Sequence, residues 1–113
     1  VEKAFEYVKR EEEFVKRTGF VLMAWLAVHN KELPNTIFVQ FLEVIKNSAQ
    51  DERNFVKKAV NWALRQIGKS RNIYLYNKAL KVSDDLRSRE NKTERWVGSN
   101  AYHELIKMKD RFN

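Results

Sequence analysis

The amino-acid sequence predicts an all-α protein, an α-α superhelix of about six helices wound as a right-handed solenoid. Long stretches of helical periodicity lie between only three glycines and one proline, which favours helices and almost no strands. The apolar pattern also repeats at a constant interval along the chain. A length of 113 residues with 43% hydrophobic content suits a single domain, residues 1–113, with one continuous core.

The helices before residue 50 follow from apolar periodicity and from their end signals. The first is expected over residues 2–10, and the second begins at the carboxylates of residues 11–13, which suit the positive end of its dipole. The second helix continues to about His29 and is apolar on all sides after Arg17, so we expect it to be the most buried, with Trp25 in the core. Pro34 suits the first turn of a third helix, which extends to about Lys46.

A fourth helix over residues 54–69 organises the rest of the chain. The spacing from Ser48 to Asp51 predicts a capping box before it, and Gly68 is expected to end it. One half of the helix is predicted to be apolar, with Phe55, Val56, Ala59, Val60, Ala63, Leu64 and Ile67. The other half carries Lys58, Asn61, Trp62, Arg65 and Lys69. Because burying an indole is worth about 2 kcal/mol or more, a tryptophan among cations predicts a contact with another molecule, and the cations predict an anion.

Two more helices complete the prediction. The first spans residues 72–87, with Leu75, Ala79, Val82 and Leu86 facing inward. The second spans about residues 94–109 and is expected to be capped by Thr93.

The helices repeat at an interval of 41 residues. The pairs Phe14-Val15, Phe55-Val56 and Trp96-Val97 are related by this shift, as are Gly19, Val60 and Ala101, then Met23, Leu64 and Leu105, then Leu26, Ile67 and Met108. Two helices in a period of about 40 to 47 residues are typical of HEAT or armadillo solenoids. The repeat predicts a core position for Trp96. It also predicts a basic row, with Arg17 beside Lys58 and Lys16 beside Lys57.

The net charge of +7 lies in the second half of the chain. Residues 1–50 hold seven basic and seven acidic side chains, whereas residues 51–113 hold fifteen and eight. Residues 53–83 contain no acid at all. A solvated basic face would explain this density, but the tryptophan within it favours a nucleic-acid backbone as partner.

Other classes of site are disfavoured. The absence of cysteine excludes a disulfide scaffold or a thiolate zinc site, and His29 and His103 have no partner at ligand spacing, so we expect no metal and no cofactor. The longest uncharged run, residues 18–30, is about half to two-thirds of a membrane span, so we expect no membrane partner. The absence of cysteine suits a reducing compartment, and we expect a cytoplasmic protein. No feature of the sequence predicts an oligomeric state.

Three stretches, FVKRTGFVLMAWLAVHN, DERNFVKKAVNWALRQIGK and RWVGSNAYHEL, resemble the bacterial and archaeal DNA alkylation repair proteins, the HEAT-like-repeat DNA glycosylases of the AlkD type. The resemblance implies a solenoid that cradles duplex DNA and hydrolyses the N-glycosidic bond of N3- or N7-alkylated purines without flipping the base into a pocket. It implies that Arg17 matches an arginine holding the DNA backbone near the lesion. Trp62 matches an aromatic residue that packs against the deoxyribose there.

The resemblance also implies that the catalytic aspartate of the family lies one repeat upstream of the arginine. Because the chain opens on Val1 within a helical pattern, we expect it to be the C-terminal fragment of a longer protein, without that aspartate and inactive alone. Glu6 and the carboxylates of residues 11–13 are interpreted as solvated or dipole-facing groups, so no catalytic residue is assigned. The chain departs from the family by a serine in GKSRN, a longer loop near Pro34 and Asn100 in place of aspartate.

Two function classes follow. In the first, the chain is the DNA-binding portion of an alkylpurine glycosylase, and its contacts to alkylated duplex DNA come from Arg17, Lys58, Trp62, Arg65, Lys69, Lys16 and Lys57. In the second, it is a non-enzymatic HEAT-repeat scaffold that binds DNA or protein, as branches of the family with little glycosylase activity are thought to do. The two differ in salt dependence and in their need for Trp62.

Overall fold

The computed structural model describes residues 1–112 and confirms the all-α prediction, with six α-helices and no strand in that range. The elements are α1 (Glu2–Val8), α2 (Glu13–His29), α3 (Asn35–Ser48), α4 (Asn54–Ser70), α5 (Ile73–Arg87), α6 (Lys92–Ile106) and a short 3₁₀ helix, η1 (Lys109–Phe112). None of these helices is both long enough and apolar enough to cross a bilayer.

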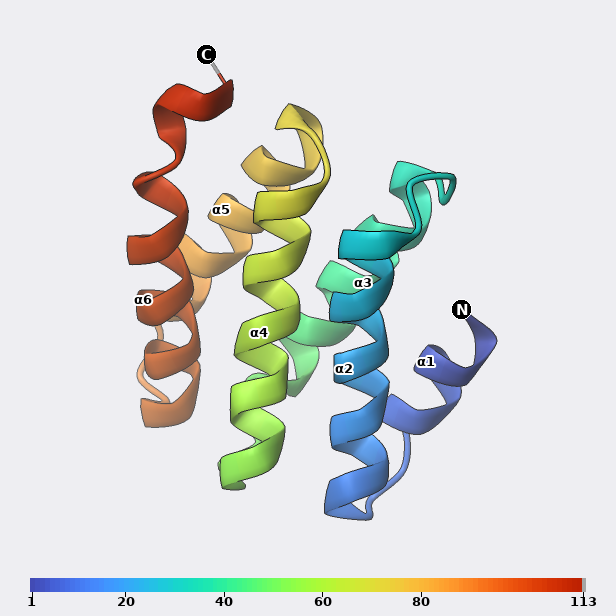
Figure 1. Ribbon diagram of the computed structural model, residues 1–113. Helices are drawn as coiled ribbons and strands as arrows, with labels where there is room; N and C mark the ends of the chain where they lie inside the picture. The colour runs from blue at the N-terminus through green and yellow to red at the C-terminus, as the bar shows by residue number, and fades with distance from the viewer. Residues whose placement is uncertain (113) are drawn as a thin grey trace.

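The helices form two rows, as expected for an α-α superhelix. In Figure 1, α2, α4 and α6 lie side by side at the front, and α1, α3 and α5 form a second row behind them. The Cα atoms extend over 41 × 35 × 17 Å, so the molecule is a slab two helices thick. The front row carries the repeated segments, and the core fills the space between the rows.

The 41-residue repeat is visible in the burial pattern. Val60 and Ala101 are fully buried at one equivalent position, and Met23, Leu64 and Leu105 are fully buried at the next. In the rear row, Phe38 repeats as Ala79 and Ile45 as Leu86, and all four side chains are fully buried. Each helix pair therefore buries its apolar face by stacking on its neighbours.

The first repeated position is the exception, because its aromatic side chains are not in the core. Phe14, Phe55 and Trp96 are 59%, 47% and 39% exposed, and Trp25 is 53% exposed. The prediction that Phe55, Trp96 and Trp25 are core residues is therefore wrong. Seven residues make about two helical turns, so Phe55 lies in line with Trp62 on the outer face of α4 and not with Val60.

Two further expectations about burial are wrong because of the helices that neighbour α4. α4 buries more of its residues than α2, because α4 has a neighbour on each side of the front row. Asn61, predicted on the polar half of α4, is only 2% exposed, because α6 covers it.

Several helix ends also differ from the predictions. Ser48 ends α3 and forms no capping box with α4, whose N-cap is Arg53 without a side-chain cap. α4 continues past Gly68 to Ser70, so this glycine is an interior residue of the helix. α6 is capped by Asn91, whose Oδ1 accepts a hydrogen bond from the Glu94 amide at 2.9 Å, and not by Thr93.

Glycine permits close contact where α5 and α6 cross. A Cβ atom at Gly98 would lie 2.4 Å from the Arg87 backbone nitrogen and 2.6 Å from the Ser83 carbonyl oxygen. Both neighbours are backbone atoms and cannot rotate away. At Gly68, by contrast, the nearest atoms belong to the end of the Leu105 side chain.

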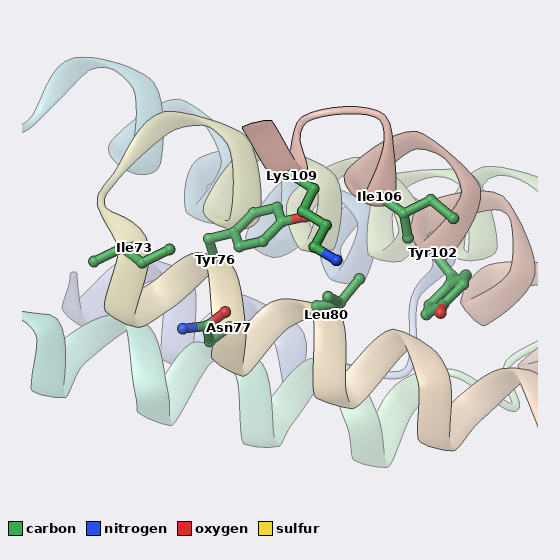
Figure 2. A pocket seen from close by; sticks show the side chains of 7 residues that line it. All are labelled: Ile73, Tyr76, Asn77, Leu80, Tyr102, Ile106 and Lys109. Atoms are coloured by element: carbon green, nitrogen blue, oxygen red, sulfur yellow. The ribbon is translucent and has the colours of Figure 1, made fainter. Parts of the chain in front are cut away.

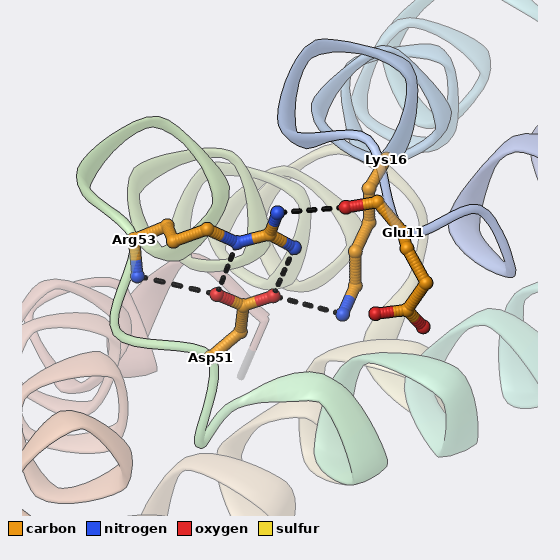
Figure 3. Close-up of polar contacts among 4 residues, drawn as sticks. All are labelled: Glu11, Lys16, Asp51 and Arg53. Atoms are coloured by element: carbon orange, nitrogen blue, oxygen red, sulfur yellow. Dashed lines mark hydrogen bonds and ion pairs between the residues drawn. The ribbon is translucent and has the colours of Figure 1, made fainter.

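An ion cluster joins the beginnings of α2 and α4 (Figure 3). Asp51 accepts hydrogen bonds from Lys16 Nζ at 2.9 Å and from Arg53 Nε and Nη2 at 3.1 and 2.8 Å. Arg53 Nη1 also donates to the Glu11 carbonyl oxygen at 2.7 Å. The hydrogen bonds from Arg53 and then Lys16 outweigh the opposing effect of burial and hold the pKa of Asp51 well below its usual range.

A second contact joins the other ends of the same two helices. Arg71, directly after α4, donates from Nη1 to the Asn30 carbonyl oxygen at 2.7 Å and from Nη2 to the Leu33 carbonyl oxygen at 2.9 Å. Its guanidinium lies 4.3 Å from the centre of the Phe38 ring, and burial lowers the pKa of Arg71. α2 and α4 are thus connected at both ends, which sets their register.

We expect Gly98→Ala to lower the free energy of unfolding by about 1–3 kcal/mol, because the new methyl group meets rigid backbone. Gly68→Ala is the matched control. Its methyl group meets the end of the buried Leu105 side chain, which can shift where backbone cannot, and alanine regains about 1 kcal/mol of helix propensity, so the loss should be smaller. Urea unfolding of both variants measures the difference, and equal losses would contradict close backbone packing at residue 98.

We expect Asp51→Asn to lower the free energy of unfolding by about 1.5–3 kcal/mol at pH 7, since it removes charge-assisted hydrogen bonds. The pKa of Asp51 is lower in the folded state, so its contribution is complete above the usual value of 3.8 and is lost as the pH falls below it. The free energies of unfolding of the unmodified chain and of Asp51→Asn, measured by urea titration at several pH values, should therefore converge in acid. Asp84→Asn, at an exposed ion pair with Arg87, is the control and should change little. If the difference in free energy of unfolding between the unmodified chain and Asp51→Asn did not change with pH, the role given to the ionised Asp51 carboxylate would be wrong.

Candidate nucleic-acid interface

A shallow depression lies between α2 and α4 on the outer face of the front row. Its volume is about 430 Å³, and it is lined by Arg17, Val21, Phe55, Lys58, Ala59, Trp62 and Arg65. Four of the seven residues predicted as contacts are therefore gathered in one place.

Helix geometry and the repeat together position these side chains. Lys58, Trp62 and Arg65 are separated by four and three residues, so they share one face of α4. Arg17 comes from the equivalent position of α2, and its guanidinium lies 5.5 Å from the centre of the Phe55 ring. The result is an apolar floor with cations along its edge.

The indole of Trp62 is 37% exposed and lies at the surface of the depression, outside the core. The neighbouring Asn61 is buried and connects α4 to α6, with Nδ2 donating to the Val97 carbonyl oxygen at 3.1 Å. Its Oδ1 accepts a hydrogen bond from Arg65 Nε at 2.8 Å. Asn61 therefore orients Arg65 at the edge of the depression.

Arg65 and Lys69 share one carboxylate on α6. Arg65 Nη1 lies 2.9 Å from Glu104 Oε2, and Lys69 Nζ lies 3.1 Å from Glu104 Oε1. Burial tends to raise the pKa of Glu104, but the hydrogen bonds from Arg65 and Lys69 outweigh it and lower that pKa. Both cations are partly neutralised, and Lys69 lies outside the depression, along the contact between α4 and α6.

The remaining predicted contacts lie apart from the depression. Lys16 is paired with Asp51, and its side chain is only 16% exposed. Lys57 lies over the Trp96 ring, 5.4 Å from its centre. The acid-free run of residues 53–83 is therefore not one patch, since Arg53 and Arg71 hold loops and Lys78 and Lys81 lie on α5 in the rear row.

Some basic side chains of the front row have no acidic partner and are therefore available to an anionic molecule. Among the described residues, Arg17, Lys57 and Lys58 take part in no ion pair. Lys58 is exposed on the depression. These three side chains can accept an anionic partner without first breaking an ion pair, although Arg17 and Lys57 also lie over aromatic rings.

Sequence reasoning missed the aromatic residues that surround the cations. Phe14, Phe55, Trp96 and Trp25 all belong to the front row, and the Trp25 ring lies 4.7 Å from that of His29. The available signal was the seven-residue spacing of Phe55 and Trp62, which indicates a second stripe on the helix. Cations interleaved with exposed aromatic rings are typical of surfaces that bind nucleic acid.

Two of the carboxylates that precede Arg17 in the chain form ion pairs elsewhere. Glu6 lies 3.6 Å from Lys3, and Glu12 lies 2.7 Å from Arg10. No carboxylate lines the depression. Within residues 1–112, no group of three or more potential ligands is arranged to hold a metal ion.

A second hollow, of about 400 Å³, has a different character. It lies between α5 and α6 near their Tyr76 and Tyr102 side chains, with Lys109 of η1 close by (Figure 2). Its lining is mainly apolar and includes Ile73, Leu80 and Ile106. The hydroxyl of Tyr76 donates to the Leu105 carbonyl oxygen at 2.7 Å. This hollow contains none of the predicted contact residues.

Comparison with known proteins gives one match. The family model described as DNA alkylation repair enzyme covers residues 1–105 of the 113-residue chain. No curated protein and no solved structure matches the chain.

Proposed function

The chain belongs to the DNA alkylation repair enzyme family, and on this premise we propose that the depression between α2 and α4 contacts duplex DNA carrying an alkylated purine. The observation that carries the proposal is the gathering of Arg17, Lys58 and Trp62 from two repeats around one depression. The unpaired cations would bind phosphate oxygens, and the indole would pack against a deoxyribose.

We propose further that the chain is part of a longer protein that hydrolyses the N-glycosidic bond of the alkylated purine. Alkylation at N3 or N7 places a positive charge on the base, which makes it a better leaving group. The deoxyribose then develops positive charge, and a nearby carboxylate would stabilise it and orient the attacking water. The contribution of this chain is to hold the DNA backbone through Arg17 and Lys58 while the bond breaks.

The lining of the depression supports a division of labour within the longer protein. It contains three cations and no carboxylate, so it suits binding better than hydrolysis. We therefore propose that the hydrolytic carboxylate comes from outside residues 1–113, as the family resemblance implies.

Replacing Arg17 or Trp62 tests the binding role. Arg17→Gln should weaken binding to an alkylated duplex at low salt and reduce the slope of log K against log salt by about 1, because one phosphate contact is lost. Trp62→Ala should weaken binding by roughly tenfold without changing that slope, because the indole contributes no charge. Fluorescence anisotropy over a range of salt concentrations measures both effects.

Two variants of the rear row serve as controls. Lys81→Gln removes an exposed cation, and Tyr74→Ala removes a ring that is 48% exposed, both from α5. Neither should change DNA affinity by more than about twofold. If the front-row variants also leave affinity unchanged, the DNA-binding role is wrong and the non-enzymatic scaffold becomes the better interpretation.

An assay of base release tests whether this chain only binds DNA and the hydrolytic carboxylate lies outside residues 1–113. The 113-residue chain should bind alkylated duplex DNA without releasing 7-methylguanine or 3-methyladenine, because no carboxylate lines its depression. The longer protein, assayed beside it, should release them. Chromatography of the freed bases gives the readout, and release by the chain alone would refute the proposed location of the carboxylate.

A further inference from the structure

An aromatic ladder crosses the front row near the beginning of each helix. It consists of Phe14 in α2, Phe55 in α4 and Trp96 in α6, which are separated by 41 residues each. The Phe14 and Phe55 rings are in contact, with their centres 5.5 Å apart. The ladder therefore runs across the helices, from repeat to repeat.

Each step of the ladder carries a cation from the preceding repeat. Arg17 of α2 lies over the Phe55 ring of α4, and Lys57 of α4 lies over the Trp96 ring of α6. Neither cation has an acidic partner among residues 1–112. Single exposed apolar residues are common on soluble proteins, but a row of rings over three helices with unpaired cations indicates an interaction surface.

A hollow lies at each end of the ladder. The first, of about 420 Å³, lies beside Phe14 and is also lined by Tyr7 and Arg10. The second, of about 250 Å³, lies beside Trp96 and is lined by Lys57 and Lys92. Both hollows thus combine an aromatic wall with a cation.

We propose that the ladder binds a single strand of nucleic acid, with unstacked bases against Phe14 and Trp96 and phosphates near Arg17, Lys57 and Lys92. Within a duplex, both faces of each interior base are already stacked. A single strand can offer successive base faces to exposed rings, and the adjacent cations suit its backbone. Glu52 lines the second hollow and would direct the phosphate toward the lysines.

The ladder is separable from the depression of the proposed function. Phe14 and Trp96 do not line the depression, whereas Phe55 lines it and belongs to the ladder as well. The test therefore uses Phe14→Ser combined with Trp96→Ser and leaves Phe55 unchanged. Both replaced rings are exposed, so the fold should be retained, and circular dichroism verifies this.

Anisotropy with a labelled oligothymidine of about 12 nucleotides and with a matched duplex measures the effect. The double variant should lose at least about tenfold in affinity for the single strand and less than about twofold for the duplex. Ile73→Ser with Tyr74→Ser, which removes a similar exposed area from α5, should change neither affinity. Equal losses for both oligonucleotides, or no loss for either, would overturn the proposal. Loss of single-strand affinity in the double variant, together with no effect of Trp62→Ala on duplex affinity, would instead contradict the proposed function alone.

A second measurement reports directly on stacking. In a Trp25→Phe and Trp62→Phe background, Trp96 is the sole indole of the chain. Oligothymidine should quench its fluorescence, because a base stacks against the ring. Binding without quenching would overturn the assignment of Trp96 as a stacking residue.

Discussion

The packing of α4 between α2 and α6 is the constraint on which the rest of the structure depends. A helix with a neighbour on each side and a second row behind it keeps only a narrow strip of its surface free. On α4 this strip contains Phe55, Lys58 and Trp62, because these residues lie within about two turns on one side. The exposure of the Trp62 indole is thus a consequence of how α4 is rotated relative to α2 and α6.

Polar contacts at the edges hold that register. Asp51 and Arg53 join the beginnings of α2 and α4, and Arg71 joins their other ends. Asn61 connects the middle of α4 to the backbone of α6. A helix rotated by one residue would lose these contacts and turn Trp62 through about 100°. The core determines which helices meet, and these polar groups determine which side chains face outward.

The fold could be predicted because buried positions carry apolar residues at regular intervals in the sequence. Residues such as Leu64 and Leu105 repeat at 41 residues, since each repeat uses the same geometry to stack on the next. The same register brought Arg17 close to Lys58, as the repeat predicted. Helix ends were less predictable, because Asn91 and Thr93 can both cap a helix and lie only two residues apart.

Which cations are paired and which aromatic rings are exposed could not be predicted, because both depend on residues distant in sequence. Lys16 and Arg17 look alike in the sequence, yet Lys16 pairs with Asp51 whereas Arg17 lies on the open surface. The 41-residue repeat placed Trp96 in the core, but its side chain is 39% exposed, because no further helix covers the outer face of the front row in the described chain. Tertiary neighbours decide both outcomes.

Chemical-shift mapping of the isotopically labelled chain with an added DNA duplex tests the central claim most directly. The indole N–H resonance of Trp62 and the amide resonances of Arg17 and Lys58 should shift together, because these residues surround one depression. Amides of α5, including that of Lys81, should not shift. Shifts confined to the rear row, or none at the indole of Trp62, would contradict the account.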